Sequence, residues 1–180
     1  MVSFMRKNKE IFKTTLSAVF LSLAFVLPFL TGEIPQIGSM LCPMHIPVIL
    51  CGLICGWKYG LIIGLIAPLL RSFTLSMPPL FPTATAMAFE LAAYGFFSGN
   101  LYKIFPKKKI FIYISLIISM IIGRLIWGGV MFGLMGFNVN NFGITAFWLG
   151  AFANAFPGII LQIILIPPIV MMYERFSKEK

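Results

Sequence analysis

The sequence predicts an all-α integral membrane protein in which residues 1–180 form one bundle of six transmembrane helices. Apolar residues make up 59% of the 180 positions and charged residues only 11%, whereas soluble domains carry about 25% charged residues. The apolar residues also fall in long runs, and in lipid only helices and closed barrels satisfy their own backbone hydrogen bonds. The runs exceed the roughly 10-residue strands of membrane barrels and lack their alternation of polar and apolar residues, so we expect helices.

Six apolar segments are the candidate spans. We place them at residues 11–30, 45–56, 59–73, 81–102, 110–135 and 145–173. The second and third are short compared with the roughly 20 residues that a helix needs to cross a bilayer. We still expect two spans rather than one long helix, because the intervening Gly56-Trp57-Lys58-Tyr59-Gly60 is typical of a tight turn at the membrane interface.

The formal charge of +9 is explained by membrane topology. If six spans leave both termini in the cytoplasm, the cytoplasmic side receives twelve of the fourteen basic residues, namely Arg6, Lys7, Lys9, Lys13, Lys58, Lys103, Lys107, Lys108, Lys109, Arg175, Lys178 and Lys180. This distribution follows the positive-inside rule, so the charge does not require a nucleic-acid partner. We therefore expect a multi-pass protein of the cell membrane, with an uncleaved first span.

Ionisable residues inside the spans mark candidate functional positions. Arg71 and Arg124 are the two remaining basic residues, and Glu33 and Glu90 are acids away from the cytoplasmic edges. An ionisable side chain within a span costs at least about 2.5 kcal/mol on insertion scales and by default indicates function. With a helical rise of about 1.5 Å per residue, Arg71, Glu90, Arg124 and Asn154 fall in the outer half of the membrane.

These residues predict a polar cavity open to the outside. Helical spacing puts Trp127 on the same face as Arg124, and Tyr94 on the same face as Glu90. Two arginines for one buried acid leave positive charge to receive a carboxylate or phosphate of a substrate. The alternative is a structural Arg–Glu pair that locks the bundle. The predicted substrate-binding residues are Arg71, Glu90, Arg124, Trp127, Asn154 and His45.

His45 is the single histidine and lies close to Cys42 in Cys42-Pro43-Met44-His45. Such residues suit a soft metal, but one histidine is weak support, so we expect His45 to bond a substrate or a neighbouring loop. We predict no metal site and no cofactor. Nucleotide-binding loops, zinc-protease motifs and serine nucleophile elbows are absent from the sequence, so we expect neither an enzyme nor an ATPase. The odd cysteine count does not indicate disulfides, and Cys51 and Cys55 are expected to be packing residues.

Small residues at helical spacing predict two packing surfaces. In the fourth segment they form a stripe long enough to be an intramolecular core, namely Ala84, Ala88, Ala92, Gly95 and Gly99. In the first segment Ala18 and Ser22 form a shorter patch, which suits either a neighbouring helix or another subunit.

Several stretches resemble the substrate-binding S components of energy-coupling factor (ECF) vitamin transporters. The most specific are residues 38–48 (GSMLCPMHIPV) and 52–60 (GLICGWKYG), with 68–72 and 78–83 in support. The resemblance implies a six-helix subunit that captures a vitamin from outside and topples in the membrane to deliver it. It also implies that Ala18 and Ser22 contact a transmembrane coupling subunit, which two cytoplasmic ATPases drive.

The resemblance leaves the substrate open. Arg71 and Arg124 favour an anionic vitamin, with pantothenate as the first candidate. A heteroaromatic vitamin stacked on Trp127 or Phe147 is an alternative, and cobalamin, with Cys42 and His45 as cobalt ligands, ranks lower. Two other classes also stay open: a membrane scaffold that binds no ligand and, ranked last, a membrane enzyme, because Glu90 has no acid or histidine near it in the sequence.

Overall fold

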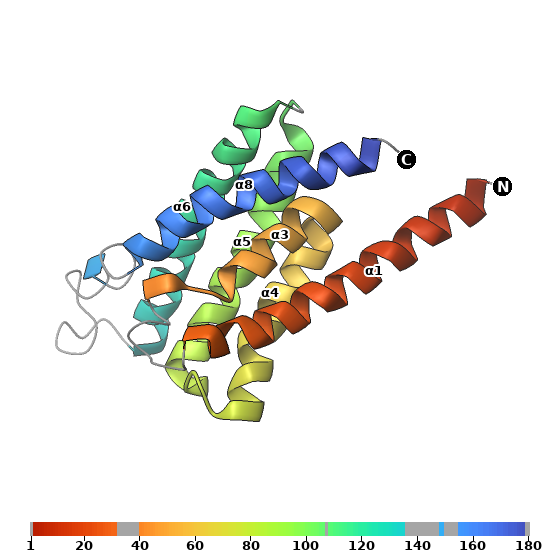
Figure 1. The fold of residues 1–180 in the computed structure, drawn as a ribbon. Helices are drawn as coiled ribbons and strands as arrows, with labels where there is room; N and C mark the ends of the chain where they lie inside the picture. The colour runs from red at the N-terminus through yellow and green to blue at the C-terminus, as the bar shows by residue number, and fades with distance from the viewer. Residues whose placement is uncertain (1, 32–39, 107, 136–147, 150–154, 179–180) are drawn as a thin grey trace.

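The fold is a helical bundle (Figure 1). A computed structural model describes residues 2–31, 40–106, 108–135, 148–149 and 155–178. Its main elements are α1 (Val2–Val26), the short helix η1 (Leu27–Thr31), α3 (His45–Cys55), α4 (Trp57–Leu75), η2 (Leu80–Ala84), α5 (Thr85–Ile104), α6 (Lys109–Met135) and α8 (Phe156–Lys178). Figure 1 shows both ends of the chain at the same end of the bundle. The all-α prediction is confirmed for the described residues.

Four stretches of the described residues are long and apolar enough to cross a bilayer, namely Lys9–Leu30, Trp57–Leu75, Lys109–Met135 and Phe156–Phe176. The two other predicted segments are also helical. The helix α3 is apolar but has only 11 residues, and α5 carries glycines, a serine and Glu90 among its 20 residues. The chain is therefore embedded in a membrane, and the number of crossings stays a prediction.

The turn between α3 and α4 is shorter than the predicted Gly56–Gly60. Only Gly56 separates the helices, because α3 ends at Cys55 and α4 begins at Trp57. Gly56 has φ 107°, a conformation that side chains strongly disfavour. Its N–H donates to the carbonyls of Cys51 and Gly52, at 3.2 and 3.1 Å. The five-residue prediction was wrong because one glycine both ends the first helix and reverses the chain.

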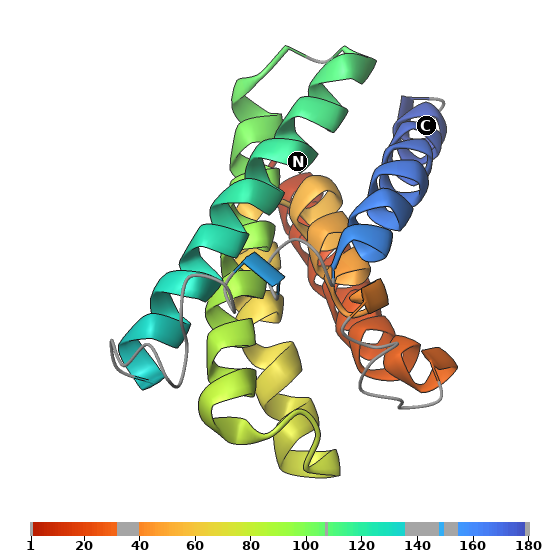
Figure 2. The same ribbon diagram turned by 90° about the vertical axis from the view of Figure 1, so that its left-hand side faces the viewer.

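The centre of the bundle is α3, in which ten of the 11 residues are buried. It contacts α1, α4, α5 and α8. In Figure 2, α6 and α8 lie on opposite sides with α3 and α5 between them. A short helix surrounded by longer ones has little contact with lipid, so its side chains are available for internal packing.

The small-residue stripe of α5 lies in this core. All five of its members are buried. A Cβ atom added at Gly95 would lie 2.2 Å from the backbone carbonyl of Gly60 on α4, and one added at Gly99 would lie 2.4 Å from the carbonyl oxygen of Gly52 on α3. The backbones of three helices are thus in direct contact, and the prediction of an intramolecular core is confirmed.

The patch on α1 faces outward. Ala18 and Ser22 are exposed, whereas Ser17 and Ala24 point into the bundle. The hydroxyl of Ser22 donates to the carbonyl oxygen of Ala18 at 3.0 Å. This hydroxyl is therefore hydrogen-bonded within α1 itself. The bundle itself therefore leaves this surface of α1 uncovered.

Candidate functional site

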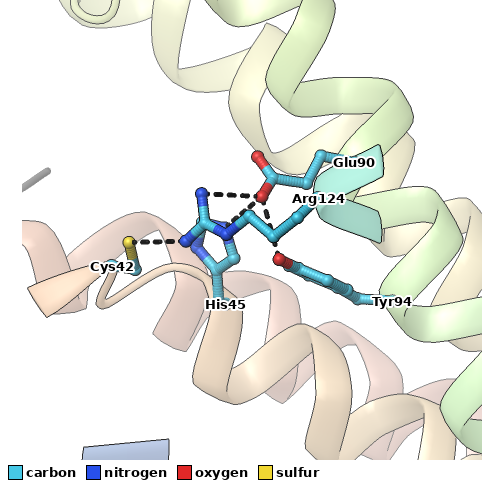
Figure 3. Close-up of polar contacts among 5 residues, drawn as sticks. All are labelled: Cys42, His45, Glu90, Tyr94 and Arg124. Atoms are coloured by element: carbon cyan, nitrogen blue, oxygen red, sulfur yellow. Dashed lines mark hydrogen bonds and ion pairs between the residues drawn. The ribbon is translucent and has the colours of Figure 1, made fainter. Parts of the chain in front are cut away.

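Five buried side chains form a polar cluster where the start of α3 meets α5 and α6 (Figure 3). We call this set the polar cluster; its members are Cys42, His45, Glu90, Tyr94 and Arg124. Figure 3 shows the guanidinium of Arg124 between the carboxylate of Glu90 and the thiol of Cys42.

The segment before α3 positions two members of the cluster. Cys42 has φ 48°, in the left-handed region, and its carbonyl accepts a hydrogen bond from the N–H of His45 at 3.0 Å. The chain then enters α3 at His45. Pro47 stands in the first helical turn, where a missing N–H costs nothing. The tight turn therefore brings the cysteine and the histidine onto the same side of the bundle.

Helical spacing aligns Glu90 and Tyr94 on α5. They are four residues apart, and the hydroxyl of Tyr94 donates to Oε1 of Glu90 at 2.9 Å. The ring of Tyr94 lies 5.2 Å from the imidazole of His45, centroid to centroid. On its other side is Gly123 of α6, where an added Cβ would lie 2.1 Å from Cε1 of Tyr94. Gly123 thus makes room for Tyr94, and our sequence analysis missed it although it directly precedes Arg124.

Arg124 connects three parts of the chain. Its Nη1 lies 3.0 Å from Oε1 of Glu90, and its Nη2 donates to Sγ of Cys42 at 3.5 Å. Nε2 of His45 lies 3.6 Å from the same Glu90 oxygen, beyond an ordinary hydrogen bond. Arg124 is 6% exposed and Glu90 only 1%. A buried pair of this kind costs much desolvation, so good geometry and further hydrogen bonds are needed to offset it.

The polar cluster is incompletely hydrogen-bonded. Among the described residues, no hydrogen-bond partner is found for Nδ1 and Nε2 of His45 or for Nε of Arg124. The same holds for Oε1 of Gln162, a buried residue of α8. An unmet buried donor or acceptor costs about 1–3 kcal/mol. Buried polar groups normally have a hydrogen-bond partner, and a bound molecule could supply one to each of these three nitrogens.

The structure brings together three of the six predicted site residues: His45, Glu90 and Arg124. Trp127 follows Arg124 by three residues on α6 and packs against a small cluster formed by Ala86 and Met131. Asn154 lies outside the described residues. Cys42 and Tyr94 join the cluster, although neither was among the predicted site residues.

Arg71 does not share Glu90 with Arg124. Its Nη1 donates to the carbonyl oxygen of Phe25 at 2.8 Å, near the C-terminal end of α1. Its guanidinium carbon lies 4.9 Å from the ring centroid of Phe29 in η1. The side chain is only 4% exposed. Arg71 therefore ties α4 to the point where α1 ends, and a cation is well suited to the C-terminal end of a helix.

We expect Arg71→Leu to lower the free energy of unfolding by about 1.5–3 kcal/mol, because a charge-assisted hydrogen bond is lost. The affinity for ligand should change less than about threefold, since Arg71 is bonded to Phe25 and stacked on Phe29. Unfolding by SDS titration and ligand titration of the same samples measure the two quantities. A loss of affinity without a loss of stability would instead make Arg71 a ligand contact.

A comparison with protein-family models decides the family. The model for the substrate-specific component of ECF transporters matches residues 12–170, most of the chain. The chain belongs to this family. The resemblance drawn from the sequence motifs is thus confirmed. No curated protein and no solved structure matches the chain.

Membership in the ECF family has consequences for function. Substrate-specific components are transporter subunits rather than enzymes. The family implies a small-molecule substrate and association with a coupling module and ATPases. In the part of the chain that the structure describes, no group of three or more His, Cys, Asp or Glu side chains is arranged to hold a metal ion. The polar cluster, with its unpartnered nitrogens, is the candidate site for the small molecule.

Proposed function

We propose that this chain is the S component of an ECF-type importer in the cell membrane. It captures a water-soluble vitamin or related micronutrient from outside and delivers it through a transmembrane coupling subunit. Two cytoplasmic ATPases supply the energy, and the chain has no ATPase of its own. Six crossings with both termini in the cytoplasm fit the six longer α-helices among the described residues and the shared position of the two ends (Figure 1).

The observation that carries the proposal is a set of buried nitrogens on His45 and Arg124 that have no hydrogen-bond partner among the described residues. An ion pair with a purely structural role stabilises the fold most when every polar atom around it is hydrogen-bonded. A buried polar network with unbonded atoms is costly because the local dielectric is low. A ligand that bonds these nitrogens would recover the lost free energy. This supports binding over the alternative of a scaffold whose charges only lock the bundle.

We propose His45, Glu90 and Arg124 as direct ligand contacts. Trp127 stays a proposed contact because it is one turn from Arg124 on α6. Asn154 stays a proposed contact from the sequence alone, since it lies outside the described residues. The contacts of Arg71 support a role in holding α1. The candidate substrates are pantothenate, a heteroaromatic vitamin and, ranked lower, cobalamin. These candidates differ in charge and in hydrogen-bonding groups, so each would need different donors and acceptors from the polar cluster.

Native mass spectrometry of the detergent-purified protein tests the proposal. We expect one co-purified small molecule, bound in a 1:1 ratio without ATP. The same protein, reconstituted with its coupling module in vesicles, should import that molecule when ATP is present inside. A protein that carries no ligand and shows no thermal shift with water-soluble vitamins would instead support the scaffold alternative.

The exposed patch on α1 gives a second test. We expect Ala18→Trp to reduce recovery of the coupling subunit in co-purification by about tenfold, because a bulky side chain prevents close helix approach in lipid. Ligand affinity should stay unchanged, since Ala18 points away from the bundle. The matched control is Ile121→Trp on α6, which is also exposed. Equal losses for both variants would contradict a specific role of the patch.

A further inference from the structure

The charge of the polar cluster is the starting point. Glu90 carries one negative charge and Arg124 one positive charge, and their atoms are 3.0 Å apart. Among the described residues, the hydroxyl of Tyr94 and the thiol of Cys42 also face this pair, and Nε2 of His45 lies 3.6 Å from Oε1 of Glu90. The positive charge of Arg124 is therefore already balanced by Glu90 before any ligand arrives.

This balance differs from what the sequence indicates. The sequence has two arginines for one buried acid, which favours an anionic ligand. In the structure the guanidinium of Arg71 is bonded to the carbonyl of Phe25 and stacked on Phe29. Among the described residues, Arg124 is the one arginine whose guanidinium lies against Glu90, at 3.0 Å.

The unpartnered nitrogens show what the ligand must offer. A neutral imidazole has one N–H donor and one acceptor nitrogen, and Nε of arginine is a donor. With a neutral imidazole at position 45, His45 and Arg124 have two donors and one acceptor without a partner among the described residues. A carboxylate supplies acceptors and no donor. An amide, a lactam, a hydroxyl or a heteroaromatic ring with adjacent N–H and C=O supplies both.

The buried position of Glu90 works against a second negative charge. Two like charges beside the same guanidinium repel appreciably at the dielectric of a protein site, and Arg124 already has Glu90 as its partner. A ligand carboxylate would compete with Glu90 for one guanidinium. We expect this to disfavour an anion by about 10- to 100-fold relative to an uncharged analogue of the same shape.

We propose that the site takes an uncharged ligand group with adjacent donor and acceptor atoms, and that Glu90 determines this specificity. Glu90 is the permanent counter-ion of Arg124 and keeps it from capturing carboxylates or phosphates. This inference rests on the proposed function, since it names the substrate class of the same site. It disfavours a carboxylate at the cluster, such as that of pantothenate, and favours an amide-like or heteroaromatic group there.

Matched pairs of compounds test the proposal by isothermal titration in detergent. The pairs are pantothenate and panthenol, nicotinate and nicotinamide, and biotin and biotinamide. The proteins are wild type, Glu90→Gln and the double variant Glu90→Gln with Arg124→Gln. Wild type should bind the uncharged member of a recognised pair at least about tenfold more tightly. In Glu90→Gln the preference should shift toward the acid by about 100-fold, because Arg124 is then unpaired.

The double variant is the matched control, because it removes both charges and restores the balance. It should again prefer the uncharged member. A wild-type preference for the acid overturns the proposal, and so does an equal loss of both members in Glu90→Gln. If Glu90→Gln does not fold, the ligand that co-purifies with wild type is identified by its exact mass, and its charge tests the proposal. A neutral molecule supports the proposal.

The possible failures are distinguishable. A co-purified carboxylic acid or phosphate ester overturns the uncharged-ligand inference and leaves the proposed function standing. No co-purified molecule, together with no binding of any compound to any of the three proteins, overturns the proposed function and this inference with it.

Discussion

Arg124→Ala is expected to weaken ligand binding by about 10- to 100-fold and to lower the free energy of unfolding by about 3–5 kcal/mol. The carboxylate of Glu90, 1% exposed, would lose its main counter-charge, and Cys42 would lose its contact with α6. An unpaired buried charge is among the most destabilising changes that one substitution makes. The effect on binding follows because Arg124 also presents one of the three unpartnered nitrogens.

The measurement separates these two effects. Unfolding is followed by SDS titration, and binding by titration of the co-purified ligand into protein that stays monodisperse. Leu125→Ala is the matched control, since Leu125 is the next residue on α6 and is 57% exposed. We expect the control to behave as wild type. Loss of stability with unchanged affinity in Arg124→Ala would show that the ion pair only locks the bundle.

Gly95→Ala is expected to lower the free energy of unfolding by about 3 kcal/mol, at the upper end of the usual cost of overpacking. The added Cβ would lie 2.2 Å from the carbonyl carbon and oxygen of Gly60 and 2.7 Å from its Cα. All three are backbone atoms, so α4 and α5 must move apart to admit one methyl group. Glu90 lies five residues before Gly95 on α5, so this movement should also weaken ligand binding.

Gly129→Ala is the control for this prediction. Gly129 is a helical glycine of α6, and an added Cβ there meets nothing within 4 Å. We expect stability equal to or slightly above wild type, since alanine favours helix by about 0.5–1 kcal/mol over glycine. Both variants are compared by SDS titration. Equal stabilities would mean that the close contact between α4 and α5 contributes little.

Much of the fold was predictable because its causes are local in the sequence. The long apolar runs and low charge indicated membrane helices. The predicted limits 110–135 match the observed α6, Lys109–Met135. In contrast, α1 begins at Val2 rather than at residue 11, and α8 begins at Phe156 rather than at residue 145. The stripe that includes Gly95 and Gly99 was predicted to be core, because five small residues on one face allow close approach. The single-residue turn at Gly56 was predicted too long, because the pattern of residues there also suits a longer turn.

The composition and motifs of the sequence by themselves determined the all-helical class and the family. They also marked His45, Glu90 and Arg124 as exceptional in an apolar chain. The partners of these residues were decided only by the tertiary structure. Arg71 and Arg124 look alike in the sequence, yet one is bonded to the end of α1 and the other to Glu90. The physical reason is that ion pairing depends on which helix faces pack together, and this depends on contacts such as that of Tyr94 with Gly123, which join segments far apart in the chain.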